Sequence, residues 1–177
     1  MGLKDRMMRR FMANAPDHGA VIQERLGDDD RVEGYAFAIP VAYERSGGGV
    51  GGGKAFTRLV NAATNVASQG KHVGGEAGSI ATTLPLDPQH CALTISTRSL
   101  TIWDFGMQFL DEEPREAFRL DRSQLVSIER TGKTRQGGQV EARLTFVDGS
   151  FTDWALHTHE AFDRGFWAAA DRLSAAA

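Results

Sequence analysis

The segment from residue 140 to residue 156 restricts the fold of this chain more than any other. Apolar and polar residues alternate over 140–146, which predicts a strand with one buried face. Asp148-Gly149 is a strong hairpin signal, and 151–156 has the composition of the return strand, with Trp154 and Leu156 on one face. The sequence therefore predicts an antiparallel hairpin near its C-terminal end.

More strands are predicted on the N-terminal side of this hairpin. Val, Ile, Thr and aromatic residues are enriched in five segments, at 32–43, 92–95, 100–103, 118–120 and 125–129. Pro40 predicts an edge position or a break in the first segment. Residues 97–99 and 132–138 are predicted turns. A meander of short antiparallel strands curls, so we expect a barrel-like sheet.

Three helices are expected toward the two ends of the chain, in addition to one within the interrupting segment described below. Residues 3–13 have one apolar stripe flanked by basic residues, and residues 18–26 form a second short helix, so residues 1–30 are predicted to be an N-terminal helical arm. The closing helix is predicted from about Thr158, its expected N-cap. One stripe of this helix carries Phe162, Phe166, Ala169 and Leu173. The fold class is therefore α+β.

Charge and cysteine content exclude several classes of protein. The net charge is −3 and the pI is near 5.9, which argues against non-specific nucleic-acid binding. Cys91 is the single cysteine, so no intramolecular disulfide can form, and we expect a reducing cytoplasmic setting. Cys91 is expected to be a buried structural thiol.

Three stretches of the sequence resemble the bacterial pleckstrin-homology-like and GRAM-like domain families. They are CALTISTRSLTIWDF at 91–105, FRLDRSQLVSIE at 118–129 and ARLTFVDGSFTDW at 142–154. The pair Leu93-Thr94, the basic Arg98 at the turn and the strand 100–103 match the family pattern. The resemblance covers roughly 85–175 and implies an antiparallel pleckstrin-homology-like β-barrel capped by a C-terminal helix. Residues 31–177 would then form one domain.

A glycine-rich loop and a predicted helix at 54–68 interrupt this domain at about 46–80. Gly48 and Gly53-Lys54 approach the phosphate-binding P-loop pattern, but Ala55 replaces the Ser or Thr that would hold Mg²⁺. Such glycines are also typical of a flexible linker. The alternatives are a linker and a nucleotide or phosphate binder that uses this loop.

Two small groups of basic residues are candidate anion sites. Lys54 and Arg58 follow the glycine run, and Arg130, Lys133 and Arg135 lie beside the predicted 132–138 turn. Each group could hold a phosphate or carboxylate, and each could equally be a solvated surface.

The N-terminal helix is a candidate face for a membrane or a partner. Met7, Met8, Arg9, Arg10 and Phe11 combine apolar and basic side chains, as peripheral membrane helices do. The alternative is that this face packs on the barrel or on a second subunit. Attachment to the inner face of an anionic membrane is therefore one hypothesis, and self-association is another.

No catalytic set or cofactor motif is visible in the sequence. His157 and His159 form a His-x-His pair, but no third and fourth metal ligand is evident, so no metal site is predicted. His72 and His90 are expected to be surface or loop residues. We therefore predict a non-enzymatic binding or scaffold module, without cofactor, that recognises a protein segment or an anionic surface. The alternatives are the peripheral membrane protein and the nucleotide binder described above.

Overall fold

A computed structural model of the chain describes residues 17–44, 71–85, 91–106, 113–135, 138–160 and 162–176. The predicted helices at 3–13 and 54–68 and the glycine run lie outside these residues, so the limits of the arm and of the interrupting segment stay predictions. Residues 71–72 are helical, and four labelled α-helices also lie within the described residues. These are α2 (His18–Leu26), α3 (Val41–Glu44), α5 (Ile80–Thr83) and α6 (Phe166–Ala176), with the 3₁₀ helix η1 at Arg122–Gln124.

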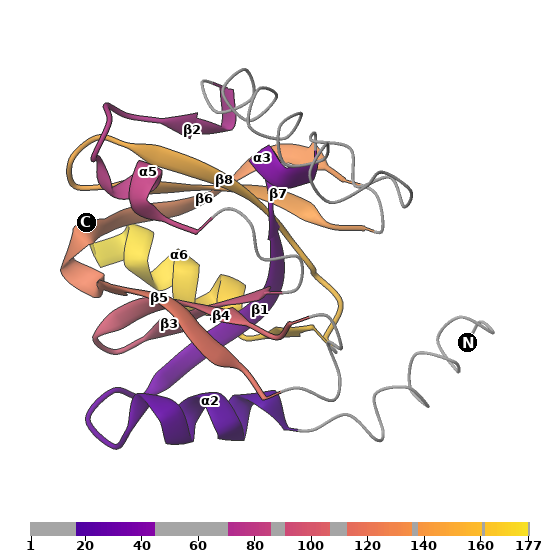
Figure 1. Ribbon diagram of the computed structural model, residues 1–177. Coiled ribbons are helices and arrows are strands. Elements are labelled where there is room, and N and C mark those ends of the chain that lie inside the picture. The colour runs from indigo at the N-terminus through magenta and orange to yellow at the C-terminus, as the bar shows by residue number, and fades with distance from the viewer. Residues whose placement is uncertain are drawn as a thin grey trace, which may run out of the picture.

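The described part of the chain is dominated by one antiparallel sheet (Figure 1). Its main path runs β5-β4-β3-β1-β8-β7-β6, while β2 pairs with β8 and β9 with β1. The strands are β1 (Val32–Pro40), β2 (Val73–Gly74), β3 (Cys91–Ser96), β4 (Ser99–Asp104), β5 (Arg115–Asp121), β6 (Leu125–Thr134), β7 (Val140–Phe146), β8 (Phe151–Leu156) and β9 (Asp163–Arg164). The α+β class is confirmed, but β5 and β6 are two open ends of the path, so the described sheet is not a closed barrel.

Strand β1 joins the two halves of the sheet. Its first part pairs with β3, and its last residues, from Ala38 to Pro40, pair with β8. Pro40 has no backbone N–H to donate to a neighbouring strand, and β1 ends at this residue, immediately before α3. The predicted break in this strand is therefore confirmed.

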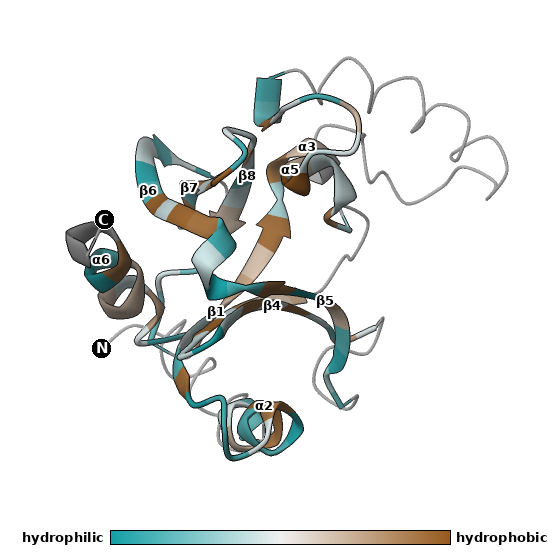
Figure 2. Ribbon diagram, turned by 90° about the vertical axis from the view of Figure 1, so that its left-hand side faces the viewer, coloured by the Kyte–Doolittle hydropathy of each residue, from teal (hydrophilic) through white to brown (hydrophobic). Residues whose placement is uncertain are grey.

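Two apolar clusters lie on opposite faces of β1, β3 and β4. The larger cluster fills the concave side of the sheet, includes Leu93, Ile102 and Trp154, and is covered by α6. The smaller cluster lies under α2, where Ile22 and Leu26 pack with Phe37, Trp103 and Phe105. Figure 2 shows α2 beneath the curved strands β1, β4 and β5 and α6 at the side of the sheet. Burial on both faces explains why β3 is buried at every residue.

Helix α2 begins and ends where its sequence predicts. The Asp17 carboxylate accepts a hydrogen bond from the Ala20 N–H at 3.2 Å, which caps the first turn. Gly27 ends the helix with a φ of 82°, a conformation that glycine adopts without strain.

The predicted start of the C-terminal helix is wrong by eight residues. Helix α6 begins at Phe166, whose N–H donates to the Asp163 carboxylate at 3.0 Å. Thr158 does not cap it, because its hydroxyl donates to the Gly138 carbonyl instead. Phe162 fits the helical stripe by spacing, but it packs edge-on against Phe37 at a centroid distance of 5.8 Å, in the cluster under α2.

Gly34 provides a test of the junction between β1 and the start of α6. A Cβ at this position would lie 2.5 Å from the backbone carbon and oxygen of Gly165, too close for any side chain. We expect Gly34→Ala to lower the free energy of unfolding by about 2–3 kcal/mol, because backbone must move to relieve the overlap.

Urea unfolding followed by circular dichroism measures this loss. Gly19→Ala is the control, because the nearest atoms to its new Cβ belong to side chains, Tyr35 at 3.1 Å and Asp17 at 3.3 Å, so it should cost less stability, and alanine favours α2. Equal stability of the two variants would contradict the proposed close approach.

Candidate functional site

Strand β5, at one open end of the sheet, is the most accessible strand of the described structure. Five of its seven residues are exposed, Phe118 is half-buried and Leu120 is buried. Among the described strands, β5 pairs only with β4. At the other end of the sheet, α6 packs against β6, although six of the ten β6 residues are exposed, and the Arg130 guanidinium lies 3.9 Å from the centre of the Trp167 ring. The two edges of the sheet are therefore not equivalent.

A pocket of about 380 Å³ lies beside the end of β5. Three connected parts of the chain form it: the end of α2 with the turn before β1, the β3–β4 turn, and the last residues of β5. Its lining residues are Leu26, Asp29, Asp30, Arg98, Ser99, Arg119 and Asp121. Its volume is within the range of small-ligand and side-chain sites.

Asp30 holds two walls of this pocket together. Its carboxylate accepts hydrogen bonds from the Arg98 N–H at 2.8 Å, the Ser99 hydroxyl at 2.8 Å and the Thr97 hydroxyl at 3.2 Å. Burial raises the pKa of Asp30, but the hydrogen bonds from these residues and from Ser96 outweigh burial and lower the pKa below its ordinary value. Asp30 is therefore an ionised, fully engaged residue that fixes the pocket.

The other charged side chains of the pocket differ in whether they already have a hydrogen-bond or ion-pair partner. Arg119 donates twice to the Glu116 carboxylate, at 2.6 and 3.0 Å, and Asp121 accepts from the backbone and hydroxyl of Ser123. Within the described ranges, the side chains of Asp29 and Arg98 have no ion-pair partner. The pocket thus offers one unengaged cation and one unengaged anion, and its three Asp and two Arg sum to −1.

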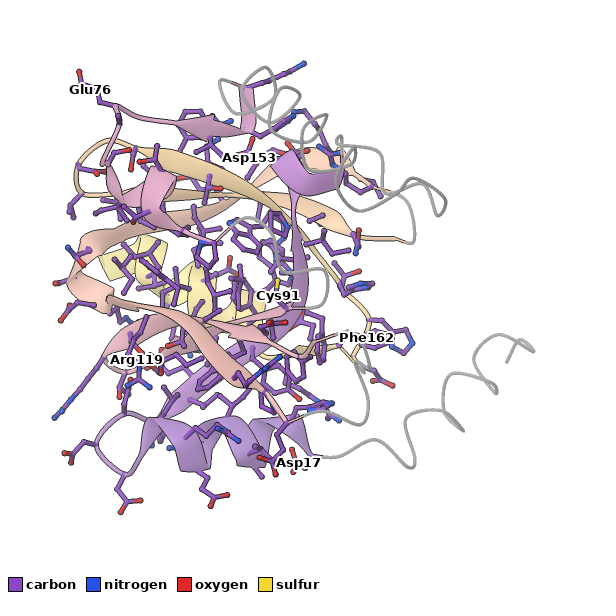
Figure 3. All side chains as sticks on the ribbon, viewed as in Figure 1. Asp17, Glu76, Cys91, Arg119, Asp153 and Phe162 are labelled. Carbon is purple, nitrogen blue, oxygen red and sulfur yellow. The ribbon has the colours of Figure 1, made fainter. Side chains whose placement is uncertain are left out.

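A second group of charges lies on the convex side of β7 and β8, far from the pocket. Asp153 and Arg119 are labelled in the upper and lower parts of Figure 3. Asp153, 1% exposed, accepts from Arg143 at 2.8 and 3.0 Å and lies 3.0 Å from His72 Nδ1. Glu141 is fully buried and accepts from Lys133 at 3.0 Å, from Thr131 at 3.1 Å and from Arg135.

The charges around this group, rather than its geometry, argue against a metal centre. His72, Glu141 and Asp153 each offer a ligand atom, and these atoms lie within 4.8 Å of one another. The two carboxylates are already opposed by three permanent cations, Lys133, Arg135 and Arg143, so a divalent ion would raise the formal charge from +1 to +3. We therefore assign the group as an internal salt-bridge network.

His72 shows where the sequence interpretation fails. It was expected at the surface or in a loop, but it is 1% exposed. Strand β2 pairs Val73 with Thr152, and this register places His72 beside Asp153. A partner 81 residues away leaves no local signal in the sequence.

The residues of the predicted basic site at the 132–138 turn do not converge. Lys133 and Arg135 bind Glu141, whereas Arg130 stacks on Trp167 and lies 3.4 Å from Asp171. Strand β6 also continues to Thr134, beyond the predicted end at residue 129, because Glu141 holds this segment against β7. Anion binding here stays a prediction.

The remaining predicted site residues lie outside the described residues. This holds for the glycine-loop site and for the N-terminal face, so both stay predictions. These residues are Gly48, Gly53, Lys54, Arg58, Met7, Met8, Arg9, Arg10 and Phe11.

Two other predicted features are visible. His157 Nε2 lies 2.8 Å from the Gln139 amide nitrogen, and His157 and His159 are not part of the candidate ligand group above. Cys91 is buried as expected, and its thiol donates to the Ala38 carbonyl at 2.9 Å. Burial raises the pKa of this thiol far above its ordinary value, so Cys91 is a structural residue rather than a nucleophile.

Comparison of the chain with protein-family models, curated proteins and solved structures finds no match. None of the helices in the described ranges combines the length and the apolar character needed to cross a membrane.

Glu141 gives a test of the salt-bridge network. Burial raises its pKa, but the hydrogen bonds and charges of Arg135, Lys133 and Thr131 outweigh burial and lower the pKa from 4.5 to about 2. Because the pKa is lower in the folded state, Glu141 stabilises the fold fully above pH 4.5, and this contribution is lost as the pH falls toward 2. The shift corresponds to about 3 kcal/mol.

We expect Glu141→Gln to be less stable than the native chain at pH 7 by a similar amount, and to lose less stability between pH 4.5 and 2. Urea unfolding at a series of pH values measures both effects. Glu24→Gln, at an exposed position of α2, is the control and should follow the native profile. A native-like pH profile for Glu141→Gln would contradict the network.

Proposed function

We propose that this chain is a non-enzymatic binding module that recognises an extended protein segment, which adds as a strand to β5. The observation that carries this proposal is the position of the mixed-charge pocket at the end of the exposed edge strand. In strand addition, backbone hydrogen bonds supply affinity and neighbouring pockets read side chains. The β5 edge and the pocket together supply both parts.

The charges favour a protein segment over an anionic surface. The pocket lining sums to −1, and the basic residues of the β6–β8 network already bind buried carboxylates. Large exposed apolar residues in the described ranges are limited to Val126 and Val147. Polar and main-chain recognition therefore fits the described surface better than a hydrophobic patch does.

The arrangement of strands supports the pleckstrin-homology-like resemblance, which we retain as part of the proposal. Strands β1, β3, β4 and β5 form one consecutive group, β6, β7 and β8 form a second, and β1 joins the two groups. Helix α6 packs across the concave side. This order agrees with a curled sheet capped by a C-terminal helix.

A hydrolytic role for the pocket is chemically weaker. Ser99 is its only hydroxyl among the lining residues, and the hydroxyl already donates to Asp30 at 2.8 Å. Asp30 would be the base for Ser99, but its lowered pKa makes it a poor proton acceptor. The Asp30–Ser99 contact is therefore a structural hydrogen bond.

Peptide selection tests the proposal. Random linear peptides are displayed on phage and selected on the full chain, and selected peptides are measured by calorimetry and by amide hydrogen exchange. We expect bound peptides to slow exchange along β5 and not along β6. Arg98→Ala should weaken binding about tenfold, because a charge-assisted hydrogen bond from the pocket is lost.

Lys71→Ala is the matched control, since it removes an exposed cation next to β2, which pairs with β8 and not with β5. It should leave the affinity unchanged. Protection of β6 and α6 instead of β5, or equal affinity for Arg98→Ala and the native chain, would refute the proposed site.

A further inference from the structure

We infer that the segment accepted by β5 carries a basic, an acidic and a basic side chain at alternate positions on the face toward the pocket. This inference rests on the proposed strand addition and names the chemistry of the partner. It follows from three charged residues of β5, which are Glu116, Arg119 and Asp121.

These three residues lie on one face of β5 because the strand contains a bulge. Glu116 pairs with Trp103, Arg119 with Thr101 and Asp121 with Ser99, and these partners alternate along β4. The register shift leaves Ala117 as an extra residue, so Glu116 shares a face with Arg119 although the two are three residues apart. Trp103 packs under α2, which identifies this face as the convex one, beside the pocket.

The three charges are held in place before any partner arrives. Arg119 donates through Nε and Nη2 to Glu116 Oε2, and both side chains stay more than one-third exposed. Asp121 is fixed by two hydrogen bonds from Ser123. The edge therefore presents a negative, a positive and a negative group in a constant order.

This order selects a complementary foreign segment over a second copy of the chain. If two β5 strands paired antiparallel with Arg119 opposite Arg119, each Glu116 would face an Asp121, and every charged pair would be repulsive. The shifted register that brings Glu116 opposite Arg119 makes two favourable pairs and leaves Asp121 opposite Pro114, so it uses only two of the three charges. A segment with basic, acidic and basic residues instead makes three favourable pairs.

The pocket strengthens the preference at one end of the strand. The residue placed opposite Asp121 lies beside Asp29 and Asp30, which line the same pocket. Asp30 is fully engaged, whereas Asp29 and Arg98 have no ion-pair partner among the described residues, so a long basic side chain at this position can pair with Asp29 while Arg98 donates to an oxygen of the segment. The basic residue at this end is therefore the principal specificity contact.

Two peptides of identical composition test the inference. The first is Thr-Lys-Val-Glu-Val-Lys-Thr, which carries the complementary order. The second is Thr-Lys-Val-Lys-Val-Glu-Thr, which keeps the net charge but exchanges two positions. We expect the native full chain to bind the first peptide about tenfold more tightly, because two cross-strand pairs change from attractive to repulsive. The preference should shrink in high salt.

The double variant Glu116→Lys/Arg119→Glu of this chain provides the decisive comparison when it is tested with the same two peptides. It reverses both charges while keeping an opposite-charge pair within β5, so the fold should be retained, and circular dichroism and thermal unfolding check this. The preference should invert toward the second peptide. Hydrogen exchange reports in each case whether β5 is the strand that is covered.

The outcomes separate this inference from the proposed function. Protection of β5 without a preference between the peptides, or a preference that does not invert in the double variant, overturns the charge pattern and leaves strand addition standing. Absence of β5 protection with these peptides and with peptides selected from the random library overturns both. Sedimentation that shows a dimer with protected β5 amides identifies a second copy as the occupant and also overturns the inference.

Discussion

The two-sided pairing of β1 is the constraint on which the rest of the structure depends. Ala38 is opposite Cys91 on one side and Leu156 on the other, so a single residue joins the two groups of strands. Small residues make this possible, because Gly34 lies against the backbone of Gly165 and Ala38 is almost fully buried. The position of α6, and with it the covering of β6, follows from this junction.

Burial on both faces of β1, β3 and β4 leaves β5 as the accessible strand of this group. The concave face is filled by the main core, and α2 covers the convex face through Ile22 and Leu26. This cover does not extend across β5, whose convex face carries Glu116, Arg119 and Asp121. The accessible edge is consequently a charged one, and the recognition that we propose for it is polar.

The sequence predicted the elements whose partners are close along the chain. The hairpin of β7 and β8 was correct in both strands, because its alternation and its Asp-Gly turn are local signals. Phe162 misled the prediction of α6, because spacing cannot distinguish a helical stripe from a residue that packs on Phe37. The pocket escaped prediction for the same reason, since Asp30 meets Ser99 across 69 residues.

The two groups of charges in the described structure act in opposite ways. Glu141 and Asp153 are buried, and the cations beside them in the described structure compensate the desolvation of these carboxylates. That network therefore stabilises the fold, and its cations are already paired rather than available to a ligand. At β5 the charges stay partly exposed, where each ion pair contributes little to stability. Because folding gains so little from these residues, stability does not account for their order, whereas the strand addition that we propose would make use of it.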